Sequence, residues 1–247
     1  LLRDFSPRIK IYKNGTVERL YKDDTVPASY DPKTRVRSRD VTISNSSLSA
    51  RNYVPDNLSK KTKIPLVIYV HGGGFCIYSS SSPIYHNDLN SLVSEANVIA
   101  VSPGYRLAPE FPIFVCYEDS WAVAHWATAH DPDPWLARWT DLTRVYFAGD
   151  SVGANITHDM AGRAGGVGNE AEPGNGPGPR KELGCGRVLV GVTEKDIWKG
   201  IWVKYYEVLK EGGEWKGEVI MWETKSIGHV FHLYKPDCHE AKELLKH

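Results

Sequence analysis

The sequence predicts an α/β fold, in which a mostly parallel central sheet is covered by helices on both faces. Two observations carry this prediction. Short runs rich in β-branched residues alternate with helical runs along the chain. The later strand-like runs also lack strict polar alternation, which is typical of strands buried on both faces. With 247 residues the chain is long enough to bury a core, and we expect residues 1–247 to form a single domain.

The N-terminal part reads as hairpins. Turn signals at Asn14-Gly15 and at Asn45-Ser46-Ser47 separate short strand-like runs. The expected strands are Ile9–Tyr12, Val17–Tyr21, Val41–Ser44 and Leu48–Val54. These runs would form an antiparallel edge beside the parallel part of the sheet.

The expected central strands follow, with helices between them. The strands are Leu66–Val70, Val98–Ser102, Val145–Ala148, Val188–Val192 and Val219–Glu223. The helices are Tyr85–Glu95, Glu118–His130, Ala154–Arg163, Trp198–Glu211 and a last one from about Asp237 to the end. One stretch breaks the alternation, because residues 166–179 read GVGNEAEPGNGPGP, and we expect a disordered loop over residues 166–182.

Composition and charge narrow the class of partner. Lys plus Arg equals Asp plus Glu, at 30 each, so nothing favours nucleic acid or an anionic membrane. No run approaches the roughly 20 apolar residues of a membrane span. The four cysteines are too far apart for a metal site and are expected to be free thiols. The first residues lack a signal-peptide pattern, so we expect a cytoplasmic protein with a small-molecule partner and leave its oligomeric state open.

The strongest chemical signal is a G-x-S-x-G motif at Gly149–Gly153, placed directly after an expected strand and before an expected helix. In that setting the flanking glycines allow a tight turn that projects the hydroxyl of Ser151 above the sheet as a nucleophile. The helix start adds a positive dipole end and free N–H groups beside a developing oxyanion. A chance glycine-rich turn is the simpler alternative, but the strand and the helix around the motif argue against it.

A second motif, His71-Gly72-Gly73-Gly74-Phe75, follows the expected strand Leu66–Val70. Consecutive glycines at a strand end let backbone N–H groups approach a ligand, and this pattern forms the oxyanion hole of lipases and esterases. We expect the donors to be the N–H groups of Gly73, Gly74 and Val152. A flexible turn is the alternative interpretation, but it would not also supply what Ser151 needs.

A nucleophilic serine requires a base, and the base requires an acid, in the chain order Ser, Asp or Glu, His. Asp196 and His229 each follow the C-terminal end of an expected strand, where active sites of open α/β sheets lie. The competing residues are His232, Asp237, Glu194 and His158. We favour His229 over His232 because Gly228 would allow the loop to bring the next residue close to the serine.

With these residues in place, the chain resembles the plant carboxylesterases. These are hormone-sensitive-lipase-like α/β-hydrolases, a group that also contains the gibberellin receptors and hydroxyisoflavanone dehydratases. The likeness is carried by DVTIS (40–44), HGGGF (71–75), YRLAPE (105–110), YEDSW (117–121), DPDPWL (131–136), GDSVGAN (149–155), LGCGRVLV (183–190) and GHVFHLYKPDC (228–238). The resemblance implies an α/β-hydrolase fold and a carboxylesterase for small-acyl esters, with Ser151, Asp196 and His229 as the triad and no metal or cofactor.

The resemblance also supplies the alternatives. Gibberellin receptors of this group bind a hormone without turnover and lack the histidine that stands here as His229, which favours an enzyme. Some dehydratases of the group carry threonine where this chain has Ser151. Only 45 residues separate Ser151 from Asp196, and the interval offers no strand before Val188, where the family has a central strand and most of a cap. We therefore expect one central strand and most of the cap to be missing, and a truncated, poorly active form is a further alternative.

Overall fold

The computed structural model describes residues 1–21, 24–43, 48–59, 61–129, 133–166, 183–212 and 215–246. The chain consists of two compact units, Leu1–Thr157 and His158–His247. Except for Gly166, the loop expected over residues 166–182 lies outside the described residues.

The main sheet of the first unit has six strands in the order β4-β5-β6-β8-β7-β9. Its strands are β4 (Tyr30–Asp31), β5 (Val36–Thr42), β6 (Ser49–Pro55), β7 (Ile64–Val70), β8 (Ile99–Gly104) and β9 (Thr140–Gly149). Strand β7 pairs in parallel with β8 and β9. Strand β5 pairs antiparallel with β4 and β6, and β6 pairs antiparallel with β8. The sheet is therefore mixed. The expected antiparallel edge is confirmed for Val41–Ser44 and Leu48–Val54 and is wrong for Ile9–Tyr12 and Val17–Tyr21, which pair in a separate sheet.

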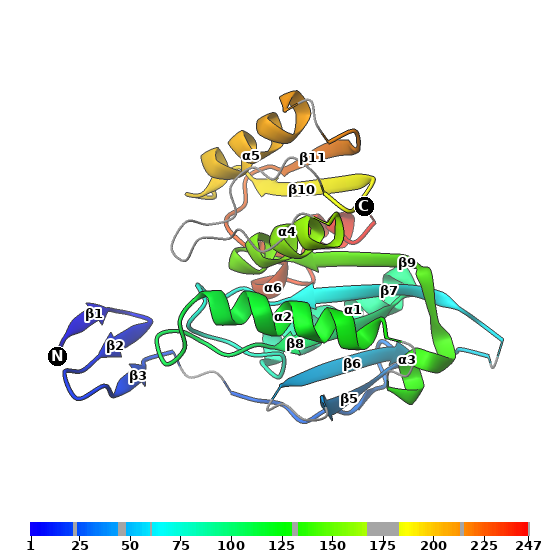
Figure 1. The fold of residues 1–247 in the computed structure, drawn as a ribbon, viewed down its shortest axis with the longest axis horizontal. Helices are drawn as coiled ribbons and strands as arrows, with labels where there is room; N and C mark the ends of the chain where they lie inside the picture. Colours follow the sequence, from blue (N-terminus) through cyan, green and yellow to red (C-terminus); the bar gives the residue numbers. More distant parts are fainter. Residues whose placement is uncertain are drawn as a thin grey trace. The chain divides into compact units, whose positions relative to one another are not determined.

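Four helices begin in this unit: α1 (Pro83–Ala96), α2 (Phe114–Ala127), α3 (Pro134–Trp139) and α4 (Val152–Ala164), the last of which runs on into the second unit. Figure 1 shows α2 in front of the sheet and α1 behind it, so helices cover both of its faces. The core lies along β7 and β8, where Leu66, Ile68 and Val101 are fully buried. These strands are buried on both faces, as their unbroken apolar runs predict.

A separate three-stranded sheet forms the N-terminus, from β1 (Arg3–Phe5), β2 (Ile9–Ile11) and β3 (Val17–Arg19). Arg19 at the end of β3 forms a two-point ion pair with Glu110, at 2.6 and 2.7 Å. Its Nε also donates to the carbonyl oxygen of Cys76 at 2.7 Å. This arginine therefore ties the N-terminal sheet to the loops that follow β7 and β8.

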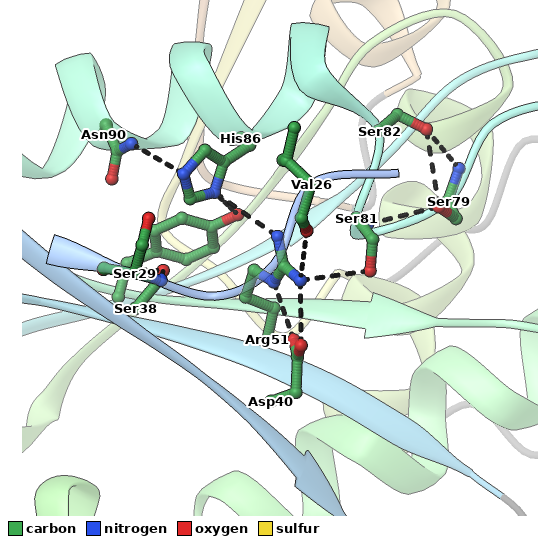
Figure 2. Close-up of polar contacts among 11 residues, drawn as sticks. Val26, Ser29, Ser38, Asp40, Arg51, Ser79, Ser81, Ser82, His86 and Asn90 are labelled. Atoms are coloured by element: carbon green, nitrogen blue, oxygen red, sulfur yellow. Dashed lines mark hydrogen bonds and ion pairs between the residues drawn. The ribbon is translucent and has the colours of Figure 1, made fainter. Parts of the chain in front are cut away.

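A buried arginine connects the antiparallel edge to α1 (Figure 2). Arg51 on β6 has a side chain only 1% exposed and forms a two-point ion pair with Asp40 on β5, at 2.6 and 2.8 Å. The same guanidinium donates to the Val26 carbonyl oxygen and the Ser81 hydroxyl, and it lies 3.4 Å from Nδ1 of His86. Because a buried charge must be fully paired, these contacts fix the start of α1 against the sheet.

The second unit is built on two parallel strands, β10 (Arg187–Thr193) and β11 (Glu218–Thr224). Helix α5 (Lys199–Glu211) connects them and packs against both. The short helices α6 (Phe231–Tyr234) and α7 (His239–Leu244) follow β11. The unit thus has the strand–helix–strand form that the sequence predicts, with Val190 and Val192 among its buried strand residues.

The expectation that the last three strands are buried on both faces is wrong. Leu142 and Tyr146 on β9 are 50% and 54% exposed, and Leu189 on β10 and Ile220 on β11 are 47% and 42% exposed. The reason is the pairing, because β9 ends the six-stranded sheet while β10 and β11 form a sheet of two. The described residues between α4 and β10, 165–166 and 183–186, contain no strand.

Candidate active site

Ser151 lies in a tight turn between β9 and α4, the strand, turn and helix order that the sequence predicts. Its φ of 53° is left-handed, a conformation that a non-glycine residue holds only when its surroundings enforce it. The two flanking glycines provide that enforcement. A Cβ at Gly149 or at Gly153 would lie 2.6 or 2.0 Å from the carbonyl oxygen of Val70, so only glycine lets the turn pack against the end of β7.

The glycine loop after β7 lies against the same turn. Gly73 and Gly74 have φ values of 105° and 61°, and a Cβ at Gly73 would lie 2.2 Å from the carbonyl oxygen of Ile77. In the described part of the chain, neither Gly73 nor Gly74 donates its backbone N–H to another group. The N–H of Val152, the first residue of α4, has no partner within its helix. These three donors all belong to the first unit and are available to an anion.

The buried His71 supports the glycine loop. Its ring is fully buried and stacks on Tyr105, with centroids 4.1 Å apart, and its Nδ1 lies 2.8 Å from the carbonyl oxygen of Gly72. Burial lowers the pKa of His71 to about 4, so the ring is neutral at physiological pH. The Tyr105 hydroxyl donates to the main-chain oxygens of the same turn. His71 is therefore part of the scaffold of the loop and not a second base.

Asp196 and His229 meet in the second unit. Nδ1 of His229 lies 2.7 Å from Oδ2 of Asp196, and the other carboxylate oxygen accepts the N–H of Trp198 at 2.8 Å. The Asp196 side chain is 6% exposed and that of His229 is 32% exposed. A carboxylate on Nδ1 places the proton on that nitrogen and leaves Nε2 as the free acceptor. The pair therefore has the form of a base and its orienting acid.

Main-chain hydrogen bonds hold together the two loops that carry this pair. The N–H of Glu194 donates to the carbonyl oxygen of Thr224, and that of Lys195 donates to Ile227, at 3.0 and 2.9 Å. The Glu194 carboxylate also accepts the N–H of Ser226 at 2.7 Å. Because the loops after β10 and β11 are joined in this way, the spacing between acid and imidazole does not depend on their side chains alone.

The argument from Gly228 that favoured His229 is wrong, although His229 does contact Asp196. Gly228 does not have a positive φ, and a Cβ there would meet nothing within 4 Å. The left-handed residues of this loop are Ser226, with φ of 61°, and Val230, with φ of 45°. The loop reverses at these two positions, so no glycine is required before His229.

The competing residues have other surroundings. His232 is half-buried on α6, and burial together with nearby His229 lowers its pKa to about 4. His158 on α4 has its Nδ1 2.8 Å from the hydroxyl of Tyr205. Glu194 binds a loop N–H, as described above, and Asp237 lies between α6 and α7. Asp196 is the acid that contacts His229.

The candidate residues divide between the two units. Ser151, Gly73, Gly74 and Val152 belong to the first, and Asp196 and His229 belong to the second. Sequence reasoning missed Tyr85 on α1, whose hydroxyl touches both the glycine loop and Asp150. Only the position of Tyr85 fourteen residues after His71 is visible in the sequence, and that spacing carries no general signal.

Other kinds of site find no support in the described residues. They contain no group of three or more His, Cys, Asp or Glu side chains arranged to hold a metal ion. Among the helices that are described, none has the length and apolar character needed to cross a bilayer. All four cysteines are free thiols, as expected.

The chain is similar to proteins of known class along nearly its full length. Residues 67–180 match a family model described as alpha/beta hydrolase fold. Probable carboxylesterase 2 of Arabidopsis thaliana is 39% identical over 292 aligned positions, covering 97% of this chain and 92% of the relative. A 2-hydroxyisoflavanone dehydratase of Glycine max is 32% identical, covering 100% and 97%. Both alignments are longer than this chain of 247 residues, so both relatives contain residues that it lacks.

Solved structures agree on the fold. A Pyrobaculum calidifontis esterase matches with a TM-score of 0.67 at 22% identity, covering 85% of this chain and 82% of that one. A vibralactone cyclase matches with a TM-score of 0.70 at 19% identity, covering 88% and 79%. At these identities the likeness shows the α/β-hydrolase fold alone. Together with the sequence relatives it leads to one conclusion: the chain belongs to the plant carboxylesterase family of α/β-hydrolases.

Proposed function

We propose that the chain is a serine carboxylesterase that hydrolyses carboxylic esters with a small acyl group, using Ser151, His229 and Asp196 as its triad. The observation that carries the proposal is the 2.7 Å contact between Nδ1 of His229 and Asp196, which leaves Nε2 free to accept a proton. The left-handed Ser151 and the free N–H groups of the neighbouring glycine loop support it. Membership of a family whose relatives include probable carboxylesterases supports the reaction class.

The proposed reaction is acyl transfer in two steps. Oγ of Ser151 attacks the ester carbonyl carbon while Nε2 of His229 takes its proton. The N–H groups of Gly73, Gly74 and Val152 stabilise the negative oxygen of the tetrahedral intermediate. The C–O bond then breaks, and the alcohol leaves with the proton from His229. Water attacks the acyl-enzyme by the same route and releases the carboxylic acid.

Asp196 has an orienting role in this scheme. Its carboxylate keeps the Nδ1 proton in place and stabilises the imidazolium that forms during each step. The second oxygen of the carboxylate is held by the N–H of Trp198, so the acid cannot rotate away from the ring without losing that bond. Every step uses side chains, backbone N–H groups and water, so the proposal needs no metal or organic cofactor.

The experiment is turnover of p-nitrophenyl acetate and longer-chain homologues by the parent protein and by Ser151→Ala. Ser226→Ala is the matched control, because Ser226 is also left-handed but lies in the loop before His229. We expect Ser151→Ala to lose nearly all turnover, since removal of a triad nucleophile leaves only the oxyanion hole and binding. Ester hydrolysis by Ser151→Ala at the parent rate would overturn the proposal.

Three parallel measurements separate the alternatives. Gibberellin binding without ester turnover would favour a receptor-like protein. Dehydration of a 2-hydroxyisoflavanone that is faster than ester hydrolysis would favour the activity in the name of the Glycine max relative. A measurable kcat/KM far below that of a longer relative, together with self-association, would identify a shortened, poorly active esterase.

A further inference from the structure

We propose that Tyr85 is a positioning residue for ester hydrolysis at Ser151: its hydroxyl joins the oxyanion loop to the residue that precedes the nucleophile. This inference rests on the proposed function and adds a residue to its machinery. Tyr85 does not touch the substrate in this scheme, because its side chain is buried, with the residue only 1% exposed. It acts through Gly72 and Asp150.

The phenol hydroxyl has two hydrogen bonds, one to each side of the site. It accepts the backbone N–H of Gly72 at 2.8 Å and donates to Oδ2 of Asp150 at 3.0 Å. The other carboxylate oxygen accepts the hydroxyl of Tyr69 at 3.3 Å. Asp150 is therefore held by two buried phenols, and of the two, Tyr85 is the one that also binds the glycine loop.

The two segments joined by this hydroxyl lie in direct contact. A Cβ at Gly72 would lie 2.5 Å from Oδ2 of Asp150, so the loop and the carboxylate leave no space for relative movement. Asp150 is followed directly by the left-handed Ser151, and Gly72 is followed directly by Gly73, a proposed oxyanion donor. A shift at the Tyr85 hydroxyl would thus reach the nucleophile and the oxyanion hole together.

The start of α1 is anchored so that the phenol has a fixed place. Tyr85 lies in the first turn of this helix, just after the buried Ser82, whose hydroxyl accepts the N–H of Ser79 at 2.8 Å. His86 follows it, 3.4 Å from the buried guanidinium of Arg51 and 3.2 Å from the side-chain amide of Asn90 (Figure 2). These contacts hold the backbone on both sides of Tyr85.

Burial also fixes the proton of the hydroxyl. Loss of hydration and the neighbouring Asp150 raise the pKa of Tyr85 well above its ordinary value, so the phenol stays protonated in any working buffer. The oxygen can then donate to Asp150 and accept from Gly72 at the same time. Both bonds would be lost in Tyr85→Phe, which keeps the ring.

Such a loss should affect the chemical step more than substrate binding. Oxyanion donors must lie about 2.7–3.1 Å from the negative oxygen, and a small displacement weakens them only where charge develops. We expect Tyr85→Phe to lower kcat by about 10–100-fold with KM changed by less than about 3-fold, a smaller loss than removing a donor outright.

Tyr53→Phe is the matched control. Tyr53 is also buried, and its hydroxyl lies 3.3 Å from Nδ1 of His86 on the same helix, on a path that does not reach the glycine loop. We expect it to lose comparable thermal stability but to keep kcat within about 2-fold, as additive, distant sites do. Affinity for phenylboronic acid, which forms a tetrahedral serine adduct, should fall in Tyr85→Phe and not in Tyr53→Phe.

The outcomes are distinct. Unchanged kcat and boronic-acid affinity in Tyr85→Phe, or losses matched by Tyr53→Phe, would overturn the inference while leaving the esterase proposal intact. A parent protein without ester turnover would overturn the esterase proposal. In that case amide exchange over residues 71–75 decides whether Tyr85 holds the glycine loop at all: faster exchange in Tyr85→Phe alone supports that part of the inference, and equal exchange in both variants overturns it.

Discussion

The two regions that carry the proposed triad differ in how they are supported. Strand β7, which leads into the glycine loop, is almost fully buried, and four close glycine contacts and a tyrosine–aspartate network lock this loop against the Ser151 turn that follows β9. Strands β10 and β11, which lead to Asp196 and His229, form a two-stranded sheet with half-exposed apolar residues. The nucleophile side is thus fixed by packing, and the base side mainly by hydrogen bonds between two loops.

This difference teaches that burial can vary between two regions while their local motifs keep their form. The local motifs on both sides remain, because each is built by its own strand and loop. Burial differs instead: β9, β10 and β11 each have one strand partner, and two of these three strands belong to the base side. The expected consequence is a base side with lower local stability than the nucleophile side.

The largest expected effect comes from removing the proposed base, His229. His229→Asn should lower kcat by about 10³–10⁴-fold, because Ser151 would lose the base that activates it. His232→Asn, the matched control three residues away, should change kcat by less than about 3-fold, because burial lowers its pKa and it contacts no candidate acid. Ester hydrolysis at saturating substrate measures both. A larger loss in His232→Asn would move the role of base to that residue.

The next prediction compares the two strand pairs directly. Leu66→Ala on β7 should lower the free energy of unfolding by about 2–5 kcal/mol, because Leu66 is fully buried. Leu189→Ala on β10 should cost less than about 1 kcal/mol, because that residue is 47% exposed. Urea denaturation of both variants measures the difference. Equal costs would show that β10 is as well packed as β7.

The sequence predicted the parts of the molecule that depend on local pattern. The central strands, the G-x-S-x-G turn and the helices α1, α4 and α5 follow from apolar runs and from glycines placed beside them. Helix α3 was missed although Asp133 caps it by accepting the N–H of Trp135 and Pro134 begins it, two signals that the sequence displays. Its shortness hid it within a loop.

Long-range contacts could not be predicted from pattern. Nothing in the sequence shows that the Tyr85 hydroxyl meets Gly72 and Asp150, since those contacts depend on how α1 crosses the sheet. The burial of Leu189 was overestimated for the same reason, because burial depends on which strand lies beside β10. The sequence therefore predicts which residues carry the chemistry. The long-range hydrogen bonds that hold them and the burial of each strand depend on the tertiary arrangement.

A smaller effect concerns the free energy of unfolding at acidic pH. Burial lowers the pKa of His71 to about 4, against about 6.5 for an unfolded histidine. Its stabilising contribution is therefore complete above pH 6.5 and is lost as pH falls toward 4, by up to about 3 kcal/mol. His71→Gln should flatten the fall in unfolding free energy between pH 7 and pH 5. Asp88, whose pKa burial raises to about 7, has the opposite dependence, but it is common to parent and variant.

The exposed His125 on α2 provides the control for this prediction. His125→Gln should retain the fall in unfolding free energy that the parent shows, because this substitution leaves the buried ring of His71 in place. Chemical denaturation at the two pH values measures each protein. A parent whose unfolding free energy does not respond to His71→Gln would contradict the neutral, buried state of that ring.

The smallest effect lies on the surface of the base side. Arg187 and Glu218 pair across the start of β10 and β11 at 2.8 Å, but their side chains are 77% and 55% exposed. Arg187→Ala should change the free energy of unfolding by less than about 1 kcal/mol, and the difference should vanish in high salt. Urea denaturation at two salt concentrations measures this. A decrease of several kcal/mol in the free energy of unfolding would contradict this, because it would mean that the exposed ion pair strongly stabilises the two-stranded sheet.

We propose that Ser151, Asp196 and His229 act as one triad. Labelling with an organophosphate, followed by mass spectrometry, tests it most directly, because the reagent reports on an activated serine without requiring a known substrate. We expect modification of Ser151 in the parent, strongly slowed modification in His229→Asn, and parent-like modification in His232→Asn. Labelling of Ser151 at the same rate in the parent and in His229→Asn, or labelling at another serine, would contradict it.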